Sequence, residues 1–397
     1  MNLPFRYTMK QPEKHSHTVS PGQPPQETPE RNQLQKTALR KNVPPQHTLT
    51  QSMKKKIAIV AGGDSSEHDV SLRSAGGILS FMDKEKYDCY IVEQKGHGMH
   101  AIVGPDNAPY YLPEDMGATR IAIDHNDFSY TCNGERHFFD FAYITIHGTP
   151  GENGILQGYF DIIGIPYSTS GVLVEALTFN KYALNNFLRS FPDIHISDSI
   201  LVRRGMKRMA DEDIIDRIGL PCFVKPNAGG SSFGVTKVKT SDQLTPAIEK
   251  AMKESDEVMV ERLITGTEIT CGCFRRSNGK PTTFPITEVV VKNVEFFDYE
   301  AKYEGKSDEI TPARIAPETA ERVSELTCHI YDLLGCYGII RIDYILSGEA
   351  GHEQINLLEI NTTPGMTPAS FIPQQVRASE FDIKDVLSEI IDGRLKD

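Results

Sequence analysis

The most informative part of this chain is LEINTTPGMT, residues 358–367, whose first four letters alternate apolar and polar side chains. Such alternation predicts a short strand with Glu359 and Asn361 on one face. Residues 341–343, Arg-Ile-Asp, alternate in the same way. If the two strands are neighbours, oxygen atoms of Asp343, Glu359 and Asn361 converge, which suits Mg²⁺ shared with phosphate groups. The alternative is a solvated outer face of a sheet.

A glycine-rich turn, residues 229–234 (GGSSFG), follows an apolar strand that carries Lys225. The backbone N–H groups of such a turn can point at phosphate while the lysine neutralises charge. The alternative is a hairpin with a surface lysine. The turn has neither the Gly-Lys-Ser/Thr ending of a Walker loop nor the spacing of a dinucleotide fingerprint. A nucleotide bound here would therefore lie between strands.

A third alternating segment, residues 260–264 (VERLI), comes shortly before Glu268. A hinge strand of this type can give backbone groups to adenine and carboxylates to ribose. Taken alone, the segment fits an exposed acidic strand at least as well.

The composition is that of a globular protein, with 397 residues, 39% hydrophobic and 24% charged. This length exceeds what one core usually serves, so we expect two or three domains. No apolar run is long enough to span a bilayer, and no secretory signal begins the chain, which predicts a cytoplasmic protein without a membrane partner. The seven cysteines lack paired zinc spacing, so reduced, mostly buried thiols are expected.

Charge is unevenly distributed along the chain. Residues 1–52 carry seven Lys/Arg and three Asp/Glu, whereas residues 53–397 carry 35 against 51, a formal charge of −16. An acidic body argues against nucleic acid as a partner. Nucleotides remain compatible, because a few local cations and backbone amides hold phosphate.

Residues 1–52 are rich in Pro, Gln, Thr and Lys without a helical or strand period, which predicts disorder. Strands and helices then alternate, as in an α/β domain with a largely parallel sheet. Its strands at 57–61 and 141–146 lead into Gly62-Gly63 and His147-Gly148. Loops at the carboxyl ends of such strands usually bind ligands. A helix is expected from Ala176 to Arg189.

Taken together, five segments resemble the ATP-grasp superfamily and, within it, the D-alanine:D-alanine ligase family. They are residues 62–71, 147–154, 225–234, 298–303 and 341–370. The likeness extends from Ile57 to about Arg377. It implies an α/β ATP-grasp fold with an N-terminal parallel α/β domain at 53–169 that holds the first D-alanine. A central ATP-grasp subdomain at 170–261 and a catalytic domain at 262–397 would clasp ATP.

The resemblance also implies a role for individual residues. ATP would be held by Lys181, Lys225, Glu261, Ile264, Glu268 and Lys302. Two Mg²⁺ or Mn²⁺ ions would be bound by Asp343, Glu359 and Asn361. The substrates would be held by Glu67, which takes the ammonium of the first D-alanine, by His147, and by Ser370 at the second carboxylate. The catalytic set would be Glu67, Ser231, Tyr303, Arg341 and Gly365.

The activity implied is ATP-dependent formation of D-alanyl-D-alanine through an acyl phosphate, for the cell-wall precursor. ATP and D-alanine would be the partners, and we expect a homodimer. A mobile loop at about 298–312 would close over the phosphate through Lys302. One departure from the family pattern is Asn153, where aspartate is frequent, and it concerns only local hydrogen bonding.

Three other hypotheses about the function remain open. Another ATP-grasp carboxylate ligase would use the same phosphate chemistry with a different acceptor, although Tyr303 and Ser370 favour a small amino acid. A nucleotide-binding protein without catalysis would lack a metal ligand or a phosphate lysine, and neither is missing. A dehydrogenase would need a dinucleotide fingerprint after the first strand, and none is present.

Overall fold

The computed structural model describes residues 54–108, 118–230, 233–291 and 307–396. Several predictions fall outside these residues: the disorder of residues 1–52, the closing loop up to residue 306, and the roles of Ser231, Lys302 and Tyr303. They stay predictions.

The first sheet has the strand order β4-β3-β2-β1-β7. Strand β1 pairs in parallel with β2 and β7, as predicted, whereas β3 and β4 add antiparallel strands at one edge. The reason is the two-residue turn Gly96-His97, in which Gly96 has a φ of +59°, so that β3 returns directly beside β2. The strands are β1 (Lys55–Gly62), β2 (Tyr87–Lys95), β3 (Gly98–Val103), β4 (Thr119–Ala122) and β7 (Phe141–Ile144).

Strand β1 is buried on both faces, as expected of a central parallel strand. Ile57 and Ile59 point into one core, and Ala58 and Val60 into the other. The first core also contains Met366 and Ile372 from near the end of the chain. The N-terminal sheet therefore packs directly against the loop that the sequence singled out.

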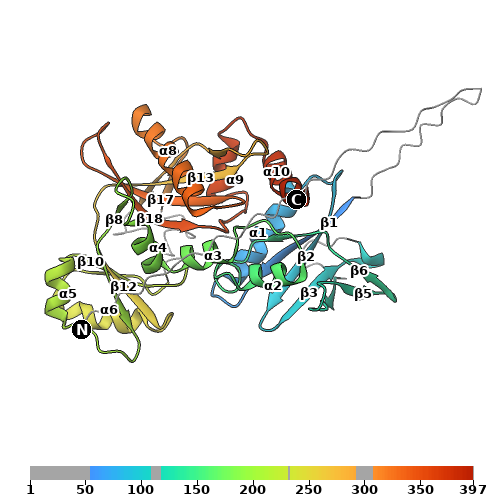
Figure 1. The fold of residues 1–397 in the computed structure, drawn as a ribbon, viewed down its shortest axis with the longest axis horizontal. Coiled ribbons are helices and arrows are strands. Elements are labelled where there is room, and N and C mark those ends of the chain that lie inside the picture. The colour runs from blue at the N-terminus through green and yellow to red at the C-terminus, as the bar shows by residue number, and fades with distance from the viewer. Residues whose placement is uncertain (1–53, 109–117, 231–232, 292–306, 397) are drawn as a thin grey trace, which may run out of the picture. The chain divides into compact units, whose positions relative to one another are not determined.

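The second sheet has the order β11-β10-β12-β9 and is antiparallel where the pairings are given. Helices α5 and α6 lie beside it (Figure 1). Its core is formed by residues such as Val224, Leu244 and Val260. The elements are β9 (Ser199–Arg203), α5 (Asp211–Ile218), β10 (Cys222–Pro226), β11 (Thr236–Val238), α6 (Leu244–Ala251) and β12 (Glu257–Arg262).

The third sheet has the order β16-β15-β13-β17-β18-β8, with β14 paired to β13. Strands β17 and β18 are antiparallel neighbours, and their register places Asp343 opposite Glu359 and Arg341 opposite Asn361. The two strands are therefore neighbours, which was the condition for their polar side chains to converge. The strands are β8 (His195–Ile196), β13 (Thr267–Arg275), β14 (Pro281–Thr283), β15 (Thr287–Val291), β16 (Ser307–Ile310), β17 (Ile340–Ser347) and β18 (Gln354–Asn361).

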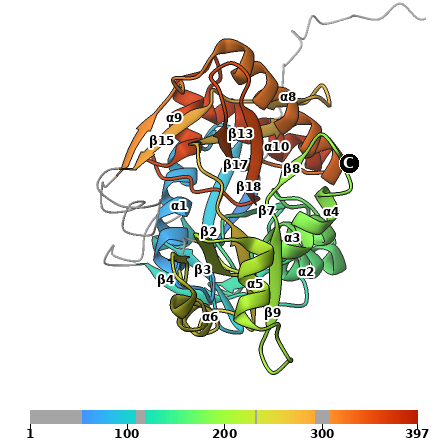
Figure 2. The same cartoon turned by 90° about the vertical axis from the view of Figure 1, so that its left-hand side faces the viewer.

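The helix predicted from Ala176 to Arg189 is in fact two helices, α3 (Val172–Phe179) and α4 (Lys181–Leu188). Asn180 breaks it: its backbone is extended, and its side chain accepts the amide of Ala183 at 2.9 Å as an N-cap. Figure 2 shows α2, α3 and α4 close to one another. The break makes Lys181 the first residue of α4.

The remaining helices and strands are distributed along the described chain. They are α1 (His68–Phe81), η1 (Pro105–Asn107), β5 (Tyr130–Cys132), β6 (Glu135–His137), α2 (Ile155–Ile163), η2 (Ser241–Gln243), α8 (Pro317–Leu334), α9 (Phe371–Arg377) and α10 (Ile383–Leu395). In the part of the chain that the structure describes, no helix combines the length and apolar character that crossing a bilayer requires. All seven cysteines are free thiols, and five are buried, as predicted.

Candidate active site

A cavity of about 560 Å³ lies between the second and third sheets. Seven of the residues that the resemblance assigned to ATP or metal line it: Lys181, Lys225, Glu261, Ile264, Glu268, Asp343 and Glu359. Gly229, Gly230 and Phe233 of the glycine-rich turn line it as well. The cavity thus has the glycine-rich turn on one side and the paired strands β17 and β18 on the other.

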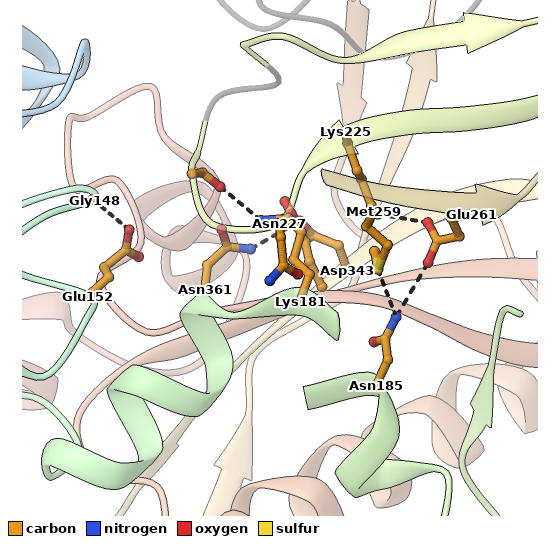
Figure 3. Close-up of polar contacts among 12 residues, drawn as sticks. Gly148, Glu152, Lys181, Asn185, Lys225, Asn227, Met259, Glu261, Asp343 and Asn361 are labelled. Carbon is orange, nitrogen blue, oxygen red and sulfur yellow. Dashed lines mark hydrogen bonds and ion pairs between the residues drawn. The ribbon is translucent and has the colours of Figure 1, made fainter. Parts of the chain in front are cut away.

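Lys225 and Glu261 form an ion pair inside this cavity, with 2.7 Å between Nζ and Oε2. Both side chains are almost fully buried. Asn185 on α4 donates to the other oxygen of Glu261 at 3.5 Å (Figure 3). Removing one partner of a buried pair leaves an uncompensated charge, so these positions depend on one another.

Lys181 spans the cavity from the turn to strand β18. Its ammonium donates to the carbonyl oxygen of Gly229 at 2.8 Å and lies 3.7 Å from Glu359 Oε2 (Figure 3). This position at the start of α4 depends on the helix break that sequence reasoning missed.

Asn227 is a residue that the sequence analysis did not single out. It is fully buried, and its side-chain amide donates to Glu257 Oε2 at 2.7 Å while its side-chain oxygen Oδ1 accepts the backbone amide of Tyr182 at 2.8 Å. It therefore joins the start of the glycine-rich turn to the start of α4. Its place directly after Pro226 and before the turn was the only available signal.

Side chains from strands β13, β17 and β18 donate hydrogen bonds to Asp343. Arg341 donates to both oxygens of Asp343, at 2.9 and 2.8 Å. Thr270 donates to Oδ1 at 2.5 Å, and Asn361 donates to Oδ2 at 3.2 Å (Figure 3). Among the described residues, no three His, Cys, Asp or Glu side chains are grouped to hold a metal ion. The set here pairs two carboxylates with an amide, and oxygen donors of this kind fit Mg²⁺.

Glu67 lies beside Gly230 of the glycine-rich turn. It stands at the N-cap of α1 and is buried, and a Cβ atom on Gly230 would lie 2.3 Å from Glu67 Oε2. A larger residue at position 230 would require the Glu67 carboxylate to move from this position. The loop after strand β1 and the glycine-rich turn therefore meet at the Glu67 carboxylate.

His147 lies next to the same carboxylate. Its Nε2 is 3.2 Å from Ser74 Oγ, and its carbonyl oxygen accepts the hydroxyl of Ser65 at 2.8 Å. Burial lowers the pKa of His147 below its usual value, and the Glu67 charge only partly opposes the shift. His147 is therefore a neutral imidazole at pH 7.

Gly365 and Ser370 lie together in the segment that follows strand β18. A Cβ atom on Gly365 would be 3.0 Å from Ser370 Oγ. The Ser370 hydroxyl also accepts the amide of Thr367 at 3.1 Å and lies 2.8 Å from Thr367 Oγ1. The residues that line the 560 Å³ cavity do not include six of the predicted site residues, namely Arg341, Asn361, Gly365, Ser370, Glu67 and His147.

Glu152 supports the His147 loop by accepting the amide of Gly148 at 2.7 Å (Figure 3). Burial, with a smaller contribution from the Glu67 charge, raises the pKa of Glu152 to about 7. The folded protein therefore keeps a proton on Glu152 that the unfolded chain releases near its ordinary pKa of 4.5. This contribution to stability is complete below pH 4.5 and is lost as the pH rises through 7.

The variant Glu152→Gln lacks this titration. The melting temperature of the variant minus that of wild type should therefore increase between pH 4.5 and 7 and stay constant above pH 7. Differential scanning calorimetry across this range measures the gain. A difference that is constant with pH would mean that Glu152 is already ionised in the folded protein.

Several known proteins are similar to this chain in sequence. The family model described as "D-ala D-ala ligase N-terminus" matches residues 56–170, and the one described as "D-ala D-ala ligase C-terminus" matches residues 190–392. A protein of Phocaeicola vulgatus named D-alanine–D-alanine ligase is 60% identical over 86% of this chain and 100% of its own length.

Solved structures give the same result at lower identity. The D-alanyl-alanine synthetase A of Vibrio cholerae is 27% identical with a TM-score of 0.74, covering 87% of this chain and 99% of its own. A D-alanine–D-alanine ligase of Bacillus anthracis, solved in complex with ATP, is 26% identical with a TM-score of 0.65, covering 86% and 98%. The predicted ATP-grasp fold is thereby confirmed.

Proposed function

The chain belongs to the D-alanine–D-alanine ligase family, and on this basis we propose that it joins two D-alanines with ATP to make D-alanyl-D-alanine for the peptidoglycan precursor. The observation that carries the proposal is one continuous arrangement. A cavity lined by Lys181 and Lys225 ends at Asp343 and Glu359, and the turn on its other side touches Glu67. A phosphate donor and an amino acid would therefore meet where these parts join.

ATP would occupy the cavity between the sheets. Lys181 and Lys225 supply positive charge for its phosphates, and Glu261, Glu268 and the backbone at Ile264 line the part that suits the nucleoside. Glu261 is already held by Lys225 and Asn185, so its carboxylate is fixed before a ligand binds. Lys302 would add a further cation from its loop.

Two Mg²⁺ or Mn²⁺ ions would be held by Asp343, Glu359 and Asn361. When bound, they would neutralise the phosphate oxygens and polarise the γ-phosphate. Asp343 now pairs with Arg341 through two hydrogen bonds. This contact with a guanidinium supports the proposal that a cation binds beside Asp343.

The first D-alanine would place its ammonium at Glu67, close to the neutral His147, with Ser231 and Tyr303 completing the network. Its carboxylate oxygen then attacks the γ-phosphorus and releases ADP, which leaves an acyl phosphate. The amine of the second D-alanine, with its carboxylate at Ser370, attacks the acyl carbon after losing a proton. Arg341 and the amide of Gly365 stabilise the oxyanion, and phosphate leaves as the peptide bond forms.

Incubation of the protein with ATP, Mg²⁺ and single D- or L-amino acids tests this function. We expect phosphate release with D-alanine and a dipeptide product detected by mass spectrometry. A different acceptor, such as D-serine or D-lactate, is the second candidate and would give a mixed product when D-alanine is also present. Phosphate release without any condensed product, whether dipeptide or depsipeptide, would contradict both.

We also infer a cytoplasmic homodimer. Free cysteines and an ATP-dependent reaction support the cytoplasm. Exposed apolar side chains on helices α2 and α3 support the dimer: Ile155, Ile162 and Leu173 are 60%, 86% and 78% exposed. Surfaces of this kind mark protein contacts.

Ile162→Asp combined with Leu173→Asp should convert the dimer to a monomer of 44.3 kDa in size-exclusion chromatography with light scattering. Met206→Asp is the control, because Met206 is 64% exposed on the loop after β9. A wild-type protein that already elutes as a monomer would contradict the dimer.

A further inference from the structure

Helix α3 carries a buried acid for which the ligation chemistry has no role. Glu175 stands in the first turn of α3 and is fully buried. The hydroxyl of Thr362 donates to Glu175 Oε2 at 2.5 Å, although the two residues are 187 positions apart in the chain. A fully buried acid must be hydrogen-bonded and is usually neutral.

Thr362 begins the loop that leads from the candidate metal ligand Asn361 to Gly365. Three buried hydrogen bonds hold this loop: Thr362 Oγ1 to Glu175 Oε2, Thr363 Oγ1 to Ile146 O at 3.0 Å, and the amide of Met366 to Ser74 Oγ at 3.3 Å. They come from helix α3, from the segment before His147, and from helix α1. The loop is thus fixed from three sides, and Glu175 supplies the contact nearest to strand β18.

Helix α3 also leads to the phosphate side of the site. It ends at Phe179, Asn180 then caps α4, and Lys181 follows as the first residue of that helix. The Lys181 ammonium reaches the carbonyl oxygen of Gly229 in the glycine-rich turn. One short helix therefore connects the Gly365 loop with a lysine of the ATP cavity.

Burial raises the pKa of Glu175 well above its usual range. Hydrogen bonds from Thr362 and Ser170 oppose the shift, and the nearby Glu152 adds to it. Burial therefore favours the uncharged form of this side chain. Glutamine has the same shape and keeps an oxygen that can accept the Thr362 hydroxyl.

We propose that Glu175 is a positioning residue for the ligation: through Thr362 it fixes the loop that carries Gly365 beside the end of β18 that carries Asn361. The inference rests on the proposed function. Without this bond the amide of Gly365 would shift relative to the oxyanion, and a small displacement is enough to slow a reaction strongly. The ATP cavity is lined by other residues and should be affected little.

Three variants test the proposal by steady-state kinetics. Glu175→Gln should keep kcat within about threefold of wild type, because the hydrogen bond survives. Glu175→Leu and Thr362→Val should each lower kcat by about tenfold or more, with the KM for ATP within about twofold of wild type. The double variant Glu175→Leu with Thr362→Val should lose no more than either single variant, because both remove the same bond.

Thr178→Val is the control on the same helix, since the buried Thr178 hydroxyl donates to Val174 O and Glu175 O within α3. It should leave kcat unchanged. ATP binding by calorimetry and the melting temperature show which variants are folded. Thr362→Val replaces a hydroxyl by a methyl group and keeps the test decisive if Glu175→Leu does not fold.

Two results would overturn the proposal. In one, Thr362→Val has wild-type kcat. In the other, Glu175→Gln loses as much activity as Glu175→Leu. Wild-type protein that makes no dipeptide at all would instead contradict the proposed function, so the two failures are distinguishable.

Discussion

Replacing Glu359 by glutamine is expected to lower kcat about a thousandfold, equivalent to roughly 4 kcal/mol of transition-state stabilisation, while the protein stays folded. Glu359 lies opposite Asp343 on paired strands and lines the cavity between the two sheets. An amide in its place keeps the size of the side chain and loses the negative charge that two divalent cations need. Dipeptide formation at saturating Mg²⁺ measures the loss, and thermal melting confirms the fold.

Glu268→Gln is the matched control for this variant. Glu268 lies on β13, lines the same cavity and is assigned to the nucleoside end of ATP. We expect it to raise the KM for ATP and to lower kcat much less than Glu359→Gln does. Equal, small losses in the two variants would place the metal ions elsewhere.

Replacing Arg341 by methionine is expected to lower kcat by about a hundredfold or more, the effect of losing one oxyanion donor. Arg341 holds both oxygens of Asp343, and its guanidinium lies 5.1 Å from the centre of the Phe371 ring. Arg341→Lys keeps the charge but cannot form the two-pronged contact, so it should recover little activity. Steady-state kinetics of both variants give the comparison.

Arg275→Met controls for the loss of an arginine in the same sheet. Arg275 ends strand β13 and pairs with Asp332 on helix α8, outside the cavity lining. Its kcat should stay within about twofold of wild type, as expected for a partly exposed ion pair. A comparable loss in both variants would show that Arg341 acts only by stabilising the sheet.

The sequence predicted those parts of the site that depend on short-range periodicity. Alternation in residues 341–343 predicts Arg341 and Asp343 on one face of a strand, and alternation in residues 358–361 does the same for Glu359 and Asn361. Neither prediction requires knowledge of how the two strands pair. The register of β17 and β18 then brings the two pairs opposite each other. The turn after Lys225 was equally visible, because its glycines follow an apolar strand directly.

Features that depend on contacts across the chain were beyond the sequence. The bond between Glu175 and Thr362 joins positions 187 apart, and a glutamate in an apolar helix gives no sign of its partner. The break at Asn180 was missed for another reason. Its neighbours have ordinary helical character, and only the cap on Ala183 and the link from Asn227 show why α4 begins there.

In the proposed reaction, a D-alanine carboxylate takes the γ-phosphate of ATP before the peptide bond forms. Its most direct test uses D-alanine labelled with ¹⁸O in the carboxylate, together with ATP, Mg²⁺ and the wild-type protein. Attack by the carboxylate on phosphorus transfers one labelled oxygen to the released phosphate for each dipeptide made. Mass spectrometry should therefore find as many molecules of singly labelled phosphate as molecules of dipeptide. Unlabelled phosphate accompanied by a dipeptide would contradict the acyl phosphate route.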